Sequence, residues 1–220
     1  MATMSDHPRI PKPTALRLSL YLRELHERIQ SGRDRVSSKV LGDALGLTDA
    51  QVRKDLACFG QFGQPGVGYR ASDLRERIRH IMGRDRGWNL AIVGVGNIGR
   101  AILAYRRFRE DGFQFVAAFD RSPQVVGQTI AGVRVLPMES IATEVRSKRV
   151  DIGVIATPGD AAQEVADRLV DAGIEGILNF APRRLTVPSR VCVGAVDLTV
   201  ALEQLAFDIS VHQPSRTEGS

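Results

Sequence analysis

The chain has 220 residues, of which 43% are hydrophobic and 25% are charged, a composition typical of globular proteins. No apolar run approaches the ~18 residues that a membrane span requires, and the first residues lack the apolar core of a secretory signal, so we expect a cytoplasmic protein without a membrane partner. The net charge of +5 is uneven, because residues 1–86 carry +6 and residues 87–220 carry −1. This basic excess indicates a polyanionic partner for the N-terminal part, although a solvated basic face would have the same charge.

Two amphipathic helices are predicted near the N-terminus. Apolar residues recur at spacings of four, three and four along residues 14–32, as on one face of a helix. They are Leu18, Leu22, Leu25 and Ile29, and Gly32 is placed to end the helix. Residues 37–47 predict a short second helix that Ser37 or Ser38 caps and that closes at Gly46.

A third helix is predicted over residues 48–60. Thr48 and Gln51 fit a capping box, in which the threonine accepts a backbone N–H and the glutamine reaches back. An inward stripe is formed by Val52, Leu56 and Phe59. The residues left at the outer face or its rim are Thr48, Gln51, Arg53 and Lys54.

Two short helices joined by a glycine-containing turn are typical of a helix-turn-helix, which we place at about residues 20–59. In a DNA major groove, Arg53 can bond guanine bidentately or hold a phosphate, Lys54 can do either, and Gln51 can read adenine. We therefore expect double-stranded DNA as the partner of this part. A small helical bundle with a charged outer face is the alternative.

A glycine-dense segment, residues 60–71, follows the third helix and resembles the wing of a winged helix. It ends in a β-compatible run that contains Gly68 and Tyr69, both placed to contact DNA. Residues 72–87 then predict a strongly basic fourth helix, capped by Ser72 and leading into a linker. The wing strengthens the DNA-binding interpretation, and it completes a winged-helix domain over residues 1–86.

Strands and helices alternate from Trp88 onward, which predicts an α/β domain with a doubly wound, Rossmann-type parallel sheet over residues 87–195. The predicted strands are 88–94, 113–120, 133–136, 151–158, 174–182 and 190–195, and the helices are 97–110, 138–148 and 160–173. One more helix is predicted over 196–212, followed by a tail, 213–220. In this fold a ligand binds at the carboxyl ends of the strands.

A glycine turn lies between the first of these strands and its helix, in the sequence "AIVGVGNIGRA". The spacing is that of a dinucleotide-binding turn, in which the first glycine permits a tight bend, the second lets a pyrophosphate approach, and the third lets the helix pack on the sheet. The predicted binding residues are Gly94, Val95, Gly96, Asn97, Ile98 and Gly99. Asp120 closes the second strand where a carboxylate bonds a ribose 2′-hydroxyl, which favours NAD(H) over NADP(H), although Arg121 weakens that inference.

The groups that a dehydrogenase needs are not apparent in the sequence. The chain has four histidines and none lies in the α/β part before its last helix, and Tyr105 has no lysine at a YxxxK spacing. Lys148, Asp160 or Asn179 would have to be recruited for catalysis, so we expect no enzyme. Cys58 and Cys192 have no metal-ligand spacing and are expected to be buried or half-buried, so we expect no metal ion. A coenzyme A-binding domain on the same sheet topology is a further alternative.

These two parts in this order resemble the Rex family of redox-sensing transcriptional repressors. The likeness runs from about Ile10 to Val211 and is carried by "QVRKDL", "GVGY", "IVGVGNIGRAI", "IATP", "GILNFAP" and "AVDLTVALEQLAF". The resemblance implies a homodimer that binds palindromic operator DNA at a low NADH/NAD+ ratio and releases it when NADH binds. It also implies that the C-terminal helix is swapped between subunits and lies near the winged helix of the partner.

Individual residue roles follow from this resemblance by position. Asp197 matches an aspartate that pairs with an arginine of the first helix, here Arg23, as an inter-domain switch. Tyr105 matches a tyrosine beside the nicotinamide, for which the loops after the fourth and fifth strands supply the further candidates Thr157, Pro158 and Asn179. The sequence departs from the family pattern at Gln64-Pro65 in the wing and at Leu198, where an aromatic residue can close over the nicotinamide.

Overall fold

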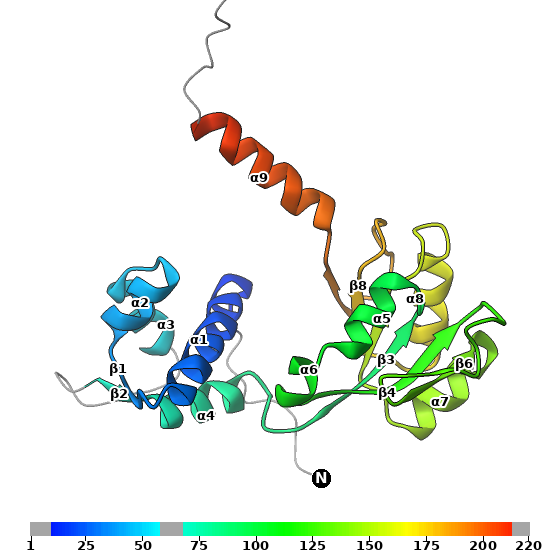
Figure 1. The fold of residues 1–220 in the computed structure, drawn as a ribbon, viewed down its shortest axis with the longest axis horizontal. Coiled ribbons are helices and arrows are strands. Elements are labelled where there is room, and N and C mark those ends of the chain that lie inside the picture. The colour runs from blue at the N-terminus through cyan, green and yellow to red at the C-terminus, as the bar shows by residue number, and fades with distance from the viewer. Residues whose placement is uncertain (1–9, 58–67, 213–220) are drawn as a thin grey trace, which may run out of the picture. The chain divides into compact units, whose positions relative to one another are not determined.

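The computed structural model describes residues 10–57 and 68–212, and it divides into two compact units, Met1–Arg86 and Gly87–Ser220 (Figure 1). The predicted tail, 213–220, and most of the predicted wing, with Gln64-Pro65, lie outside the described residues, as do Cys58 and Phe59.

The first unit contains four helices among its described residues: α1 (Lys12–Gln30), α2 (Ser38–Leu45), α3 (Asp49–Ala57) and α4 (Ala71–Ile81). They enclose one core, to which α1 contributes the predicted face, with Leu18, Leu22 and Leu25 buried and Ile29 partly buried. Tyr21, also on α1, is fully buried and was not predicted. The core residues of the other helices are Leu41, Val52, Leu56, Ala71, Leu74 and Ile78.

The turn between α2 and α3 is tight, as a helix-turn-helix requires. Ser37 caps α2 by accepting a hydrogen bond from the Val40 N–H at 3.2 Å, and Gly46 ends the helix in the left-handed region with φ of +67°, so both predicted ends are confirmed. A Cβ added at Gly42 would lie 2.5 Å from the Leu47 carbonyl oxygen. Only glycine therefore allows α2 to approach the start of α3 this closely.

Two short strands, β1 (Arg35–Val36) and β2 (Tyr69–Arg70), pair antiparallel, and β1 was not predicted. Gly68 has φ of +79°, and a Cβ there would lie 2.6 Å from the Val36 carbonyl oxygen. The predicted Ser72 cap is wrong: α4 begins at Ala71, and Asp34 satisfies its first N–H groups instead, through its carbonyl to Ala71 and its carboxylate to Ser72. The backbone N–H of Ser72 is the largest cause that lowers the pKa of Asp34.

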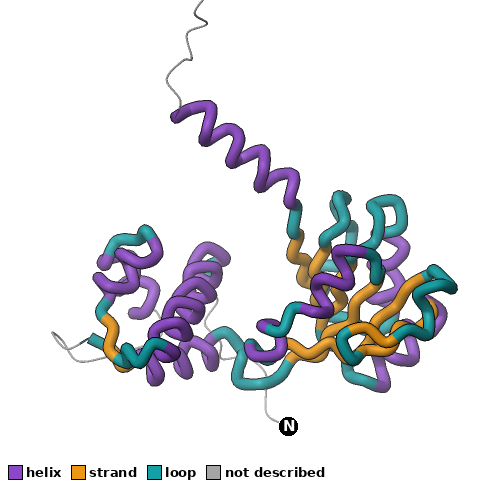
Figure 2. Tube along the Cα trace, in the orientation of Figure 1, coloured by secondary structure: helices purple, strands orange, loops and turns teal. Residues whose placement is uncertain are grey.

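The second unit is built on a seven-stranded sheet in the order β5-β6-β4-β3-β7-β8-β9 (Figure 2). Its strands are β3 (Trp88–Val93), β4 (Phe113–Asp120), β5 (Thr129–Ile130), β6 (Val133–Pro137), β7 (Ile152–Ile155), β8 (Gly176–Asn179) and β9 (Cys192–Ala195). All neighbouring pairs are parallel except β5 with β6, a hairpin that was not predicted. Without β5 the order is that of the doubly wound dinucleotide-binding fold, which confirms the predicted fold class.

Each face of this sheet has its own core, since successive strand residues point to opposite sides. Leu90 and Ile92 pack with α5 (Asn97–Ala104) on one face. Ala91 and Val93 pack on the other face with α7 (Ile141–Ser147) and α8 (Ala162–Asp171). The two cores hold the glycine turn rigidly at the carboxyl end of β3.

Several predicted elements of this unit have different limits in the structure. The single helix predicted over 97–110 is two helices, α5 and the short α6 (Arg107–Glu110), because Tyr105 has an extended backbone with ψ of 98°. The helix predicted over 138–148 begins as a 3-10 turn, η1 (Met138–Ser140), before α7.

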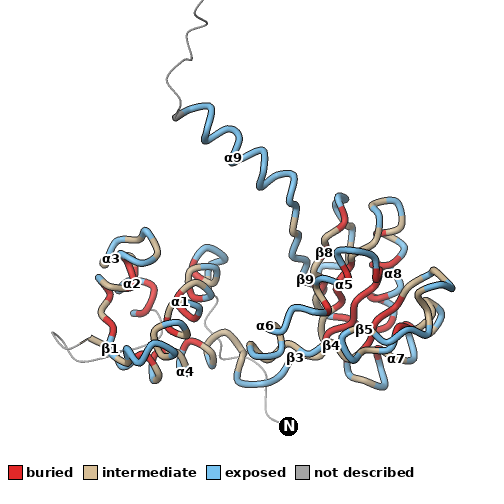
Figure 3. The backbone as a smooth tube through the Cα atoms, viewed as in Figure 1, coloured by how far each residue is buried: buried red, intermediate tan, exposed pale blue. Residues whose placement is uncertain are grey.

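The last helix, α9 (Leu198–His212), leaves its apolar side chains uncovered in the single chain, and Figure 3 colours it as exposed along its length. Its exposed large hydrophobic residues are Leu198, Val200, Leu202, Leu205, Phe207, Ile209 and Val211. Cys192, predicted to be buried or half-buried, is exposed on β9. Among the described residues no helix is long and apolar enough to cross a bilayer, and no group of three metal-ligating side chains was found.

Candidate functional site

The glycine turn at the carboxyl end of β3 contains two glycines that the protein itself requires. Gly94 has φ of +93°, and a Cβ there would lie 2.6 Å from the Ala156 carbonyl oxygen. A Cβ at Gly99 would lie 2.0 Å from the Gly94 carbonyl oxygen. Any side chain at either position would therefore displace backbone, which accounts for the first and third glycines of the motif.

Gly96 is different, because nothing among the described residues requires a glycine there. Its φ is −74°, which any residue can adopt, and a Cβ built on it meets no atom within 4 Å. Gly96 is also the N-cap of α5 and has no side chain to cap the first N–H groups of that helix. Asn97 and Ile98 lie exposed at this end. The open space beside uncapped N–H groups at a helix N-terminus fits a phosphate group of a ligand.

Two charged side chains fix Val95, the residue between these glycines. Asp120, at the end of β4, accepts a hydrogen bond from the Val95 N–H at 2.7 Å, and Arg100 donates to the Val95 carbonyl at 3.2 Å. The second carboxylate oxygen of Asp120 accepts from the Ser122 N–H at 2.8 Å. Asp120 therefore holds the turn in place, and each of its oxygens keeps a second lone pair for a ligand hydroxyl.

A cleft of about 340 Å³ opens in front of this turn. Of the residues predicted to bind the cofactor, five line it: Gly94, Gly96, Asp120, Thr157 and Pro158. The lining residues that were not predicted include Met138, Glu139 and Arg168, which come from η1 and α8. Their only sequence signal is that they follow the third and fourth parallel strands, whose carboxyl ends face the binding edge.

Thr157 carries a polar atom that no described residue satisfies. Its hydroxyl oxygen is buried and has no hydrogen-bond partner, although the residue lines the cleft. A buried hydroxyl without a partner costs about 1–3 kcal/mol. A polar ligand in the cleft would remove that cost, so the residues present fit a dinucleotide.

Two predicted cofactor residues lie elsewhere in this unit. Asn179 is buried, and its side-chain amide bonds the backbone of Ala181 and Arg183, at distances from 2.7 to 3.2 Å, so it shapes the loop after β8. Tyr105 is exposed at the end of α5, where it lines a separate hollow of about 640 Å³ with Phe108 and Phe113. The structure does not bring either side chain into the cleft with the glycine turn.

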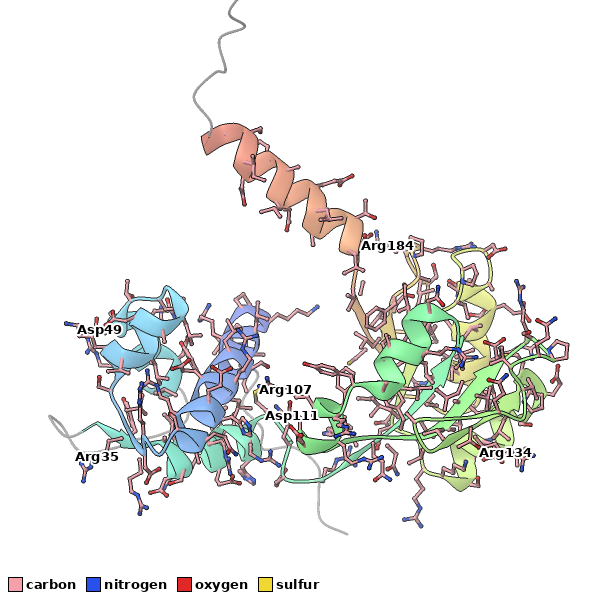
Figure 4. The ribbon with its side chains drawn as sticks, in the orientation of Figure 1. Arg35, Asp49, Arg107, Asp111, Arg134 and Arg184 are labelled. Carbon is pink, nitrogen blue, oxygen red and sulfur yellow. The ribbon has the colours of Figure 1, made fainter. Side chains whose placement is uncertain are left out.

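In the first unit, most of the residues predicted to contact DNA lie on α3 and at the residue before it. The Thr48 hydroxyl accepts from the Gln51 N–H at 3.1 Å, which confirms half of the predicted capping box. The other half is wrong, because the Gln51 amide donates to Asp55 at 2.9 Å instead of reaching back. Arg53 and Lys54 are exposed, and Arg53 is 2.7 Å from Asp49, which Figure 4 labels at the start of α3.

The remaining predicted residues lie on separate elements. Tyr69 on β2 is half-buried, with its hydroxyl 3.2 Å from that of Ser38. Arg23 is exposed on α1 and has no ion pair with a described residue. Asp197 directly precedes α9, and one of its carboxylate oxygens accepts from the N–H groups of Thr199 and Val200, at 2.9 and 3.2 Å. The other oxygen of Asp197 has no hydrogen bond among the described residues.

Two family models match separate parts of the chain. One, described as the N-terminus of a putative DNA-binding protein, matches residues 9–57, and one described as a CoA binding domain matches residues 85–183. The two matches correspond to the two units.

Curated relatives match nearly the whole chain. A redox-sensing transcriptional repressor Rex from Carboxydothermus hydrogenoformans is 48% identical over 201 residues, which cover 91% of this chain and 97% of that protein. The protein of the same name from Desulfitobacterium hafniense is 43% identical and covers 93% and 98%.

Solved structures match to the same extent. RSP, a Rex-family repressor, has a TM-score of 0.84 at 35% identity over 93% of this chain and 95% of its own. RSP in complex with NAD+ and operator DNA has a TM-score of 0.87 at 36% identity and covers 93% and 94%. RSP in complex with NADH has a TM-score of 0.84 at 34% identity and covers 93% and 96%.

Proposed function

The chain belongs to the Rex family of redox-sensing transcriptional repressors, and on that premise we propose that it senses the NADH/NAD+ ratio. It binds palindromic operator DNA when NADH is scarce and leaves the operator when NADH binds. One observation carries this proposal: a helix-turn-helix unit and a dinucleotide cleft occur in one chain that matches these repressors over 91% of its length.

NAD(H) fits the cleft through the chain's own groups. The backbone N–H groups of the exposed residues Asn97 and Ile98 would hold the pyrophosphate, and Gly96 leaves room for it. Asp120 accepts from the ribose hydroxyls and disfavours a 2′-phosphate. Thr157 supplies a buried hydroxyl that has no hydrogen-bond partner in the described part of the chain. When bound, the cofactor supplies a ring whose charge and planarity differ between its oxidised and reduced forms, and the groups that surround this ring distinguish them.

Release of DNA follows from linkage between the two binding sites. A ligand shifts a conformational equilibrium only if it binds one conformation more tightly, so NADH must favour the form that does not bind DNA. A coupling free energy of about 3 kcal/mol changes operator affinity about 150-fold.

The repressor acts as a homodimer. The apolar side chains along α9 need a partner surface, and a second copy of the chain with the helix swapped between subunits provides one. The α3 helices of the two subunits, which are the recognition helices, then lie about one DNA turn apart, as a palindrome requires. Closure of the cleft around NADH rotates the subunits and breaks that spacing.

The switch pairs Arg23 with Asp197 of the partner subunit. Arg23 is exposed and unpaired among the described residues, and Asp197 keeps one carboxylate oxygen without a hydrogen bond. The ion pair forms in only one of the two states, so its free energy biases the equilibrium between them.

Competition between DNA and nucleotide tests this function. The operator is first obtained by selecting random-sequence duplex DNA with the wild-type protein, and a duplex with scrambled half-sites serves as comparison. We expect NADH to release the selected duplex and NAD+ to have little effect. Release by NADPH as readily as by NADH would remove the role of Asp120, and release by coenzyme A alone would favour the CoA-binding alternative. Steady oxidation of NADH by small carbonyl compounds would identify an enzyme.

Two variants separate the functions of the units. Arg53→Ala weakens operator binding and leaves NADH affinity unchanged, whereas Gly96→Ala leaves operator binding intact and raises the NADH concentration that releases the operator. Arg134→Ala, at an exposed position of β6 and labelled in Figure 4, is the matched control for the loss of an arginine and should change neither.

A further inference from the structure

A buried carboxylate joins α1 to α3 in the first unit. Asp55, on the inner side of α3, accepts two hydrogen bonds from the Arg17 guanidinium, at 2.5 and 2.7 Å, and one from the Tyr21 hydroxyl at 2.8 Å. The Gln51 amide, one turn earlier on α3, donates a fourth bond at 2.9 Å. These four residues are called the Asp55 cluster.

The cluster is enclosed by the helical core. Asp55 is 2% exposed and Tyr21 is fully buried, whereas the Arg17 side chain reaches the surface and is 22% exposed. Burial raises the pKa of Asp55, but the hydrogen bonds it accepts and the positive charge of Arg17 lower it more, so the group is ionised at neutral pH. An ionised carboxylate in this place needs donors in fixed directions.

These directional bonds control the rotation of α3 about its own axis. Successive residues of a helix are about 100° apart, so Arg53 lies about 200° from Asp55, on the opposite side. Rotating a helix by about 15° moves atoms at its surface, about 6 Å from the axis, by about 1.5 Å. That displacement is larger than the width of the hydrogen-bond distance range, about 0.5 Å. The neighbouring core contacts of Val52 and Leu56 are non-directional, because hydrophobic burial has no preferred direction.

We propose that Asp55 is a positioning residue for operator recognition: its bonds to Arg17 and Tyr21 fix the rotation of α3, so that the opposite face meets the bases in register. This inference rests on the proposed function, because it assumes that α3 reads DNA. It assigns a role to an acidic residue of α3 that is buried and therefore does not itself contact DNA.

A paired replacement distinguishes positioning from stability. In Arg17→Met/Asp55→Leu both charges leave together, and a well-packed apolar pair often preserves stability where a single deletion does not. We expect the NADH affinity to stay near that of the wild type, and the free energy of unfolding to fall by no more than about 1–3 kcal/mol, the cost of the buried Tyr21 hydroxyl that loses its acceptor. Affinity for the selected operator should fall about tenfold or more, as for the loss of one base contact, while affinity for the scrambled duplex stays within about threefold.

The matched control is a second ion pair of α1, Glu24 with Arg28. Its side chains are 2.7 Å apart and both are 17% exposed, but the pair lies within one helix and makes no link to α3. Glu24→Leu/Arg28→Met should leave the ratio of the operator and scrambled-duplex affinities unchanged.

A milder variant keeps the test decisive if the paired replacement unfolds. Tyr21→Phe removes one hydroxyl, and we expect the ratio of the two affinities to fall about threefold or more in a folded protein. An unchanged ratio in the folded paired variant, or in Tyr21→Phe if the pair is unfolded, would overturn the positioning role and leave a structural one. If the wild type itself selects no preferred duplex, the proposed function fails instead.

Discussion

Alanine substitutions at the three glycines of the turn should separate glycines needed by the protein from the one needed by the ligand. At Gly96 the backbone suits alanine and a Cβ has open space, so Gly96→Ala should raise the free energy of unfolding by about 0.4–1 kcal/mol through the unfolded chain. At Gly94 the substitution combines a positive φ with a 2.6 Å approach to the Ala156 carbonyl oxygen. At Gly99 the approach to the Gly94 carbonyl oxygen is 2.0 Å. Each of these two should lower the free energy of unfolding by about 2 kcal/mol or more.

Gly96→Ala, which should not destabilise the protein, should nevertheless weaken NADH binding. A methyl group at Gly96 occupies the space beside the first N–H groups of α5, so the pyrophosphate loses at least one charge-assisted hydrogen bond, worth about 1.5–3 kcal/mol. The dissociation constant for NADH should therefore rise about 10- to 150-fold. Urea unfolding followed by the fluorescence of Trp88, the single tryptophan, gives the stability of the second unit, and calorimetric titration gives the affinity. Normal NADH binding by a stable Gly96→Ala protein would refute the assignment of the open space to the pyrophosphate.

Three further substitutions have expected outcomes. Ala131→Gly should raise the free energy of unfolding by about 0.5–1 kcal/mol in the same urea assay, because Ala131 has φ of +50° in the two-residue hairpin between β5 and β6, where glycine is unstrained. Arg53→Ala should cost only about 0.3–0.5 kcal/mol of stability through its exposed ion pair, yet weaken operator binding by about 1–3 kcal/mol in mobility-shift titrations. Asp55→Asn should reduce the fall in the free energy of unfolding that accompanies a decrease in pH. The folded-state pKa of Asp55 lies below its unfolded value, about 3.9, so its ionised form contributes stability above that value and loses the contribution as the pH falls through the folded-state pKa. Urea unfolding by circular dichroism from about pH 5 to pH 2 should show a flatter profile for the variant, and an identical profile would contradict the cause given.

Local sequence patterns predicted the two units well where one pattern dominates. The apolar runs of β3 and β4 and the helical face of α1 appear nearly as expected, because burial alone decides them. The break after Ala104 was missed, since "YRRFRE" contains no glycine or proline and fits a continuing helix. The hairpin strand β5 has only two residues, too few for a periodic signal.

The site was predicted only where its residues are close in sequence or end a strand. Gly94, Gly96 and Asp120 follow from motif spacing and meet in one cleft. Met138 and Arg168 reach the same cleft because the strand order places β6, β4, β3 and β7 side by side, and no local pattern contains that order. Long-range contacts of this kind depend on the completed sheet.

Some polar residues that the sequence assigns to ligand binding make hydrogen bonds within the protein. These bonds determine which variants are informative about binding. The Gln51 amide was expected to read adenine but bonds Asp55, and Asp120 holds the turn through Val95. Substituting either residue would disturb the scaffold and the contact together, so a loss of binding would not show which of them mattered. Substitution of Gly96 or Arg53 should change the stability of the fold little. Gly96 lies beside open space, and Arg53 is exposed on α3. Binding defects at these two positions would therefore report on NADH and on DNA directly.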